Sequence, residues 1–269
     1  MKSSIVVASS HAAPEAFAVL RGFDEASAIA HDLGYDGVEL ALKCAEEVSL
    51  GSISRSLQQR GLEVSAISTG QVFSSCNLMF TDGDAERRSA LLKLFSSFID
   101  LAAELGCPVN IGRVRGCLGD GDSSARRMNA VDGIRKALDY AELKGVTLLL
   151  EPVNRAEIDF INSIPDAMEF IAALDRPNIA LMPDSYHMSI EDPDNASALT
   201  MAGGLVRYMH IADSNRQAPG KGNIDFRGLF RTLRSIGYDG WCTVECLPVP
   251  DPITAARESV DSLRELFRC

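Results

Sequence analysis

Basic residues are scarce in this chain relative to acidic ones. Lys and Arg together number 26 against 37 Asp and Glu, so the formal net charge is −11 over 269 residues. Binding to nucleic acid or to an anionic membrane requires clustered Lys and Arg, and the sequence therefore predicts neither partner. Small anionic substrates are not excluded, because net charge does not describe the field inside a single site.

CxxC pairs and long apolar segments are also missing. The cysteines are odd in number and scattered along the chain: they are Cys44, Cys76, Cys107, Cys117, Cys242, Cys246 and Cys269. This pattern fits reduced thiols in a cytoplasmic protein better than a disulfide framework. The charge-free stretch 64–81 is too polar to span a bilayer, and the apolar run 5–8 is too short for a secretory signal. We therefore expect a cytoplasmic protein without a membrane segment.

A junction between a helical segment and a strand recurs along the sequence, and we call it a joint. An amphipathic helical segment ends at a glycine, which accepts the left-handed conformation that closes a helix, and a short apolar run follows. Such runs are typical of parallel strands buried on both faces. The joint occurs at 33–40, 60–67, 105–111, 144–151 and 236–245, and further strands are predicted at 5–9, 178–183 and 205–211.

The alternation of eight strands with eight helical segments predicts the fold. Strict alternation indicates a parallel sheet, and eight units in a chain of this length match a (β/α)₈ TIM barrel. A doubly wound sheet is the alternative, but no GxGxxG motif follows the first strand. Because no linker or low-complexity tract interrupts the pattern, we expect residues 1–269 to form one barrel domain.

Polar residues end the last four predicted strands. Glu151 and Asp184 end the fifth and sixth, and His210 and Glu245 lie at the ends of the seventh and eighth. A charged group at the end of a buried strand must be paired or bind a metal, and these ends meet at one rim of a barrel. Three carboxylates and one imidazole suit Mn²⁺, Mg²⁺ or Co²⁺ better than a thiolate-type zinc site.

The segments around these residues carry a resemblance to a known family. They are EPVNR at 151–155, DSYHM at 184–188, HIADSNR at 210–216 and VEC at 244–246. Together they resemble the xylose-isomerase-like barrel superfamily, and within it the ketose 3-epimerases of the tagatose and psicose type. The stretches TGQ at 69–71, DFIN at 159–162 and APGKG at 218–222 look closer to a subgroup that epimerises keto-sugar acids, such as 5-keto-L-gluconate to D-tagaturonate.

The resemblance implies a mechanism and a set of ligands. Glu151, Asp184, His210 and Glu245 would hold one divalent metal ion, with Mn²⁺ favoured over Mg²⁺ and Co²⁺. Glu151 and Glu245 would also be the catalytic pair. One glutamate would remove the proton at C3, and the other would return a proton to the opposite face of a cis-enediolate.

The resemblance also assigns substrate contacts. His187 and Arg216 match positions that contact substrate oxygens, and Glu157 matches a glutamate that binds a substrate hydroxyl. The loop after the fourth strand contains an arginine pair that epimerases of neutral ketoses usually lack. A guanidinium can hold a carboxylate as a fork, so we expect Arg115, or alternatively Arg113, to select a sugar acid.

Other readings of the same barrel stay open. An aldose–ketose or hydroxypyruvate-type isomerase would use the same metal site, and a catalytically silent barrel would bind a sugar without turnover. An endonuclease IV-like repair enzyme is disfavoured, because its zinc site needs many histidines and the chain has 4. The expected partner is a small keto-sugar or sugar acid, and the resemblance implies a homo-oligomer, either a dimer or a tetramer. Glu39, at the end of the second strand, could line the pocket, but membership of a structural ion pair is the favoured interpretation.

Overall fold

Eight parallel strands form the centre of the molecule. The computed structural model describes residues 1–14 and 16–268; Cys269 therefore lies outside the described residues, and the other six cysteines are free thiols. The strands are β1 (Lys2–Ala8), β3 (Gly37–Ala41), β4 (Glu63–Ser68), β5 (Val109–Ile111), β6 (Leu148–Leu150), β7 (Ile179–Leu181), β8 (Tyr208–Ile211) and β9 (Trp241–Val244). All eight correspond to strands that the sequence predicts.

The strands close into a barrel. Hydrogen-bonded neighbours follow the order β7-β6-β5-β4-β3-β1-β9-β8, and every pairing is parallel. Isolated parallel bridges, Leu181 with Val206 and Asp184 with His210, join the two ends of this order. The prediction of a (β/α)₈ TIM barrel is therefore confirmed, and the carboxyl ends of all eight strands meet at one face.

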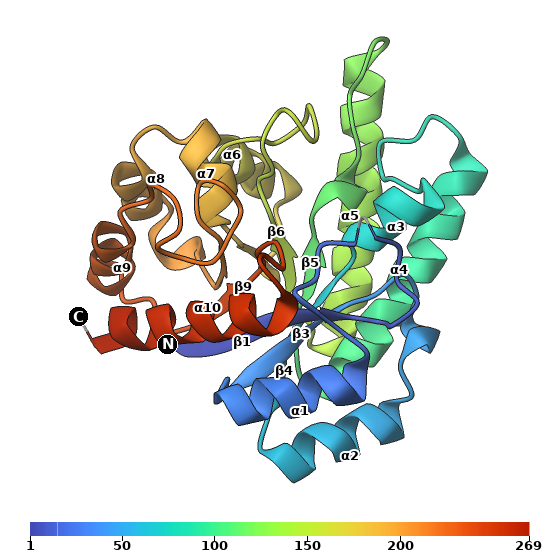
Figure 1. Ribbon diagram of the computed structural model, residues 1–269. Helices are drawn as coiled ribbons and strands as arrows, with labels where there is room; N and C mark the ends of the chain where they lie inside the picture. Colours follow the sequence, from blue (N-terminus) through green and yellow to red (C-terminus); the bar gives the residue numbers. More distant parts are fainter. Residues whose placement is uncertain (15, 269) are drawn as a thin grey trace.

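Helices surround the strands (Figure 1). The eight that connect or follow barrel strands are α1 (Phe23–Leu33), α2 (Leu50–Arg60), α4 (Ala85–Leu105), α5 (Ser123–Lys144), α6 (Ile164–Leu174), α8 (Asn195–Ala202), α9 (Phe226–Ser235) and α10 (Pro252–Arg268). Within the described residues, no helix combines the length and the apolar character needed to cross a membrane.

The predicted strict alternation is wrong in detail, because the loops at the carboxyl ends contain structure of their own. Short helices α3 (Gly70–Cys76) and α7 (Ser185–Glu191) follow β4 and β7, and a two-residue strand, β2 (Leu20–Arg21), pairs with β1. One single 3₁₀ turn, Gly203–Leu205, precedes β8 at the opposite face, whereas two others, Ala45–Glu47 and Arg113–Arg115, follow β3 and β5 at the carboxyl ends. Functional loops of a TIM barrel lie at this face, so these additions shape the site.

The predicted glycine joints set the spacing between helices and strands. Gly34 ends α1 with φ 78°, and Gly106 ends α4 with φ 69°, so both occupy the left-handed region. The backbone N–H of Gly34 donates to Ala30 and His31 carbonyls at the end of α1. This closure satisfies carbonyls that a helix end leaves unpaired and turns the chain toward the next strand.

Candidate active site at the carboxyl ends of the strands

The four side chains predicted from strand ends come together. Glu151 directly follows β6, Asp184 follows β7, His210 lies in β8 and Glu245 directly follows β9. One ligand atom from each lies within 4.8 Å of the others, and all four side chains are buried. A buried cluster of three carboxylates and one imidazole can hold a divalent metal ion.

Asp184 provides a structural test of that fit. Its Oδ1 accepts a hydrogen bond of 2.8 Å from the backbone N–H of Tyr186 and so caps α7. Its Oδ2 is buried and has no hydrogen-bond partner among the described residues. Burial raises the pKa of Asp184 to about 6, although the charges of His210 and Arg216 oppose this shift. A buried carboxylate oxygen without a donor is costly unless a cation binds it, so the residues fit a metal ion.

The two glutamates of the cluster face the same nitrogen of His210. Nδ1 of His210 lies 3.2 Å from Glu151 Oε1 and 3.7 Å from Glu245 Oε2. Burial alone would raise the pKa of Glu151, but the hydrogen bond and charge of His210 outweigh it and lower this pKa to about 2. Burial raises the pKa of Glu245 to about 8, and the charge of Glu151 adds to that effect. The two carboxyl groups are therefore in electrostatically different environments.

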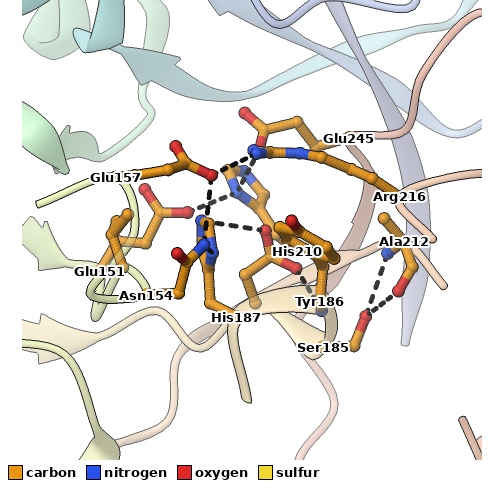
Figure 2. A network of polar contacts seen from close by, with 12 residues as sticks. Glu151, Asn154, Glu157, Ser185, Tyr186, His187, His210, Ala212, Arg216 and Glu245 are labelled. Carbon is orange, nitrogen blue, oxygen red and sulfur yellow. Dashed lines mark hydrogen bonds and ion pairs between the residues drawn. The ribbon is translucent and has the colours of Figure 1, made fainter. Parts of the chain in front are cut away.

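Arg216 and Glu157 form the side of the pocket next to Glu245. Arg216 Nη1 donates to Glu157 Oε1 at 2.6 Å, and Nη2 donates to Glu245 Oε2 at 3.4 Å. Figure 2 shows the guanidinium between the two carboxylates. Its plane lies against Phe17, 3.7 Å from the ring centroid, and against Tyr186 at 4.8 Å. The buried Nε has no partner among the described residues, so one donor is available.

His187 presents a donor to the same space. Asn154 Nδ2 lies 2.8 Å from His187 Nδ1, and because an amide nitrogen only donates, Nδ1 must accept (Figure 2). Burial lowers the pKa of His187 to about 3, which keeps the ring neutral. The proton of the neutral ring is therefore on Nε2, which lies 3.7 Å from Asp184 Oδ2.

The structure places Arg115 differently from the prediction. Its side chain is fully buried, and its donors bond to the backbone carbonyls of Gly112, Glu151, Phe160 and Ile161 at 2.7–2.9 Å. Burial lowers its pKa to about 10. The expectation that Arg115 binds a substrate carboxylate is wrong, because the guanidinium is committed to tying the loop after β5 to the segment after β6.

Arg113, the alternative in the same loop, does line the pocket. Its guanidinium lies 5.4 Å from the Phe17 ring centroid and 5.9 Å from that of Phe73. Nη1 lies 3.8 Å from Glu157 Oε2, and the side chain makes no hydrogen bond within residues 1–14 and 16–268. Arg113 therefore keeps its donors available at the pocket.

Two asparagines in the site were not singled out from the sequence. Asn110 Nδ2 donates to Glu151 Oε2 at 3.0 Å, and its buried Oδ1 lacks a partner among the described residues. The available signal was a polar residue inside the three-residue buried strand β5. Asn154 had no such signal, because it lies in an irregular segment that only the fold brings against His187.

The closed parallel barrel is a TIM barrel, and the buried, oxygen-rich cluster at the carboxyl ends of its strands could hold a metal ion. The family model described as Xylose isomerase-like TIM barrel matches residues 27–266. The chain belongs to this family, and the resemblance found in the sequence is confirmed.

Named relatives sharpen this assignment. The chain is 32% identical to L-ribulose 3-epimerase of Methylomonas sp. (strain DH-1), over 83% of this chain and 78% of the relative. It is 29% identical to 3-dehydro-D-guloside 4-epimerase of Escherichia coli (strain K12), over 87% and 90%. The crystal structure of D-allulose 3-epimerase from Methylomonas sp. superposes with TM-score 0.83 and 25% identity, covering 99% of both chains. These relatives are sugar epimerases, so the prediction of an enzyme of the isomerase class is confirmed.

Proposed function

We propose that the protein is a divalent-metal-dependent epimerase that inverts C3 of a keto-sugar or keto-sugar acid. The observation that carries the proposal is the buried cluster in which Glu151 and Glu245 both approach Nδ1 of His210, so that two carboxyl groups lie at one site. Relatives named as ketose 3-epimerases support the reaction. Glu151, Asp184, His210 and Glu245 would hold the metal, with Mn²⁺ favoured over Mg²⁺ and Co²⁺ because both oxygen and imidazole ligands are present.

When bound, the metal supplies Lewis-acid polarisation of the substrate carbonyl. One glutamate accepts the proton from C3, and the C–H electron pair forms a double bond to C2 while the carbonyl oxygen gains charge. The second glutamate donates a proton to the opposite face of C3, where the electron pair of the C2–C3 double bond forms the new C–H bond and an oxygen lone pair restores the carbonyl. Two carboxyl groups on opposite faces of a planar intermediate are what inversion requires, because a single group would return the proton to the face it left.

Neighbouring side chains would orient the substrate. Nε2–H of His187 and the Nε–H of Arg216 can donate to oxygen atoms on which charge develops, and such donors lower the barrier when they are fixed in advance. Glu157 is held by Arg216 and can accept a hydrogen bond from a substrate hydroxyl.

Arg113 supports a sugar acid as the substrate. Acidic and basic side chains alternate in a chain of contacts that starts at the cluster of proposed metal ligands. The order is Glu245, Arg216, Glu157 and Arg113. If the metal neutralises Glu245, the two arginines share the single charge of Glu157, and the pocket has a positive excess near Arg113. A guanidinium with free donors binds a carboxylate with two parallel hydrogen bonds, as in a keto-uronate such as 5-keto-L-gluconate.

A substrate panel tests this proposal. Metal-stripped protein would be supplied with Mn²⁺ and assayed on neutral ketoses, keto-uronates and phosphorylated ketoses. We expect Mn²⁺-dependent epimerisation with the highest kcat/KM on a keto-uronate. An aldose–ketose or hydroxypyruvate-type isomerase would instead yield aldose products, and a silent sugar-binding barrel would bind without turnover.

The contribution of Arg113 can be separated from the reaction itself. We expect Arg113→Ala to lower kcat/KM on the keto-uronate at least about tenfold and to leave neutral ketoses nearly unchanged. Arg257→Ala on the exposed surface of α10 is the matched control and should change neither. An equal loss on charged and neutral substrates would contradict carboxylate recognition by Arg113 while leaving the epimerase proposal intact.

A further inference from the structure

A polar layer lies inside the barrel next to the ligand cluster. TIM-barrel interiors are dominated by branched apolar side chains, yet Glu39, Ser65, Tyr208 and Thr243 are fully buried here. The Tyr208 hydroxyl lies 2.7 Å from Glu39 Oε2 and 2.7 Å from Ser65 Oγ, and it accepts from Thr243 Oγ1 at 2.6 Å. Burying so many polar groups is tolerated only when each is satisfied, so the layer is a connected network.

Glu39 links this network to the ligand cluster. His210 Nε2 lies 2.9 Å and 3.1 Å from the two Glu39 oxygens, whereas Nδ1 on the other side of the ring faces Glu151 and Glu245. Both Glu39 and His210 are fully buried. In the neutral ring, which is the form that binds a metal, a hydrogen bond from Nε2–H to Glu39 leaves the Nδ1 lone pair directed at the cluster.

We propose that Glu39 is a positioning residue that presents Nδ1 of His210 to the metal ion. This inference rests on the metal site of the proposed function. The ring cannot rotate by half a turn without losing its hydrogen bond to Glu39, and Tyr208 fixes the carboxylate from a second side. The sequence interpretation of Glu39 as a structural ion-pair member named no partner and assigned it no role at the metal site.

Metal affinity is the readout that distinguishes positioning from simple structural support. Wild-type, Glu39→Gln and Glu39→Ala proteins would be stripped of metal and titrated with Mn²⁺ by calorimetry and by electron paramagnetic resonance. We expect Glu39→Ala to weaken Mn²⁺ binding about 10- to 100-fold, because outer partners of metal-binding histidines have effects of this size. Glu39→Gln keeps an acceptor oxygen without the charge, so this variant should lose less Mn²⁺ affinity than Glu39→Ala. The Tm of each stripped protein reports stability separately.

Ser65→Ala is the matched control within the same network. It removes a contact of Tyr208 and leaves the contact between Glu39 and His210 in place. We expect it to lower the Tm of the stripped protein while Mn²⁺ affinity stays at the wild-type value.

Two results would overturn the inference: folded Glu39 variants that bind Mn²⁺ like the wild type, or a loss in Ser65→Ala as large as in Glu39→Ala. The proposed function fails differently. A wild-type protein that does not bind Mn²⁺ would overturn both proposals. Glu39-dependent Mn²⁺ binding without epimerisation of any ketose would support the positioning role and contradict only the reaction.

Discussion

The strand-end cluster and the loop after β5 border one pocket but are built in different ways. In the cluster, Glu151, Asp184, His210 and Glu245 come from four consecutive strands, and their positions follow from strand register. In the loop, Arg113 and Arg115 are two residues apart in one 3₁₀ turn and have opposite environments. Arg115 is buried and bonded to four backbone carbonyls, whereas Arg113 lies against aromatic rings at the pocket.

This difference separates the residues that we assign to catalysis from the residue that we assign to substrate selection. The groups to which we assign the chemistry are attached to a rigid sheet, which preserves sub-ångström placement. The group we assign to substrate selection is held in a loop by aromatic rings and by one ion pair of 3.8 Å with Glu157, so it can change with little effect on the barrel. Arg115 belongs to the rigid part, because it anchors the backbone carbonyl of Glu151 itself.

The largest expected effect tests the cluster. Glu151→Gln and Glu245→Gln each keep the size of the side chain but remove the ability to exchange a proton. We expect either change to lower kcat about a thousandfold while substrate binding is retained. Steady-state kinetics and equilibrium sugar binding check this, with Glu63→Gln on the exposed start of β4 as the control. Full activity in both variants would exclude the two-glutamate mechanism.

A comparison of the two arginines tests whether Arg115 has a structural role in the loop and Arg113 has none. We expect Arg115→Ala to reduce the free energy of unfolding by about 3 kcal/mol, because it leaves several buried carbonyls without donors. Arg113→Ala should cost less than about 1 kcal/mol, since only the contacts with aromatic rings and one long ion pair are lost. Urea denaturation of both variants measures the difference. Similar destabilisation by both would show that the two arginines share a structural role.

A smaller effect is expected from the hydrogen bond that orients His187. Asn154→Asp is nearly isosteric, but a carboxylate accepts from Nδ1–H and would move the ring proton away from Nε2. We expect kcat to fall about tenfold, and at least as much as in Asn154→Ala. Stopped-assay kinetics on both variants check which of them has the lower kcat. If Asn154→Asp were fully active, the Nε2–H donor would not be needed.

The sequence was sufficient for the barrel and for the cluster because both depend on local signals. Glycine joints mark five of the helix ends, and a charged residue at the end of an apolar run marks a strand end at the rim. The same reasoning failed for Arg115, because a loop arginine gives no signal of whether carbonyls from a distant segment surround it. The contacts of Glu39 and Asn154 could not be predicted from the sequence either. Their partners, His210 and His187, are distant in the chain and approach them only in the folded barrel.

Turnover in deuterated water tests the central claim that the protein exchanges a proton at C3. The substrate turned over best in the panel would be converted with Mn²⁺ in ²H₂O, and the position of deuterium in the product would be read by NMR. We predict one deuterium at C3 in the epimerised product and none in the Glu151→Gln reaction. Deuterium at C1, C2 or C4, or epimerisation without any label, would contradict the account.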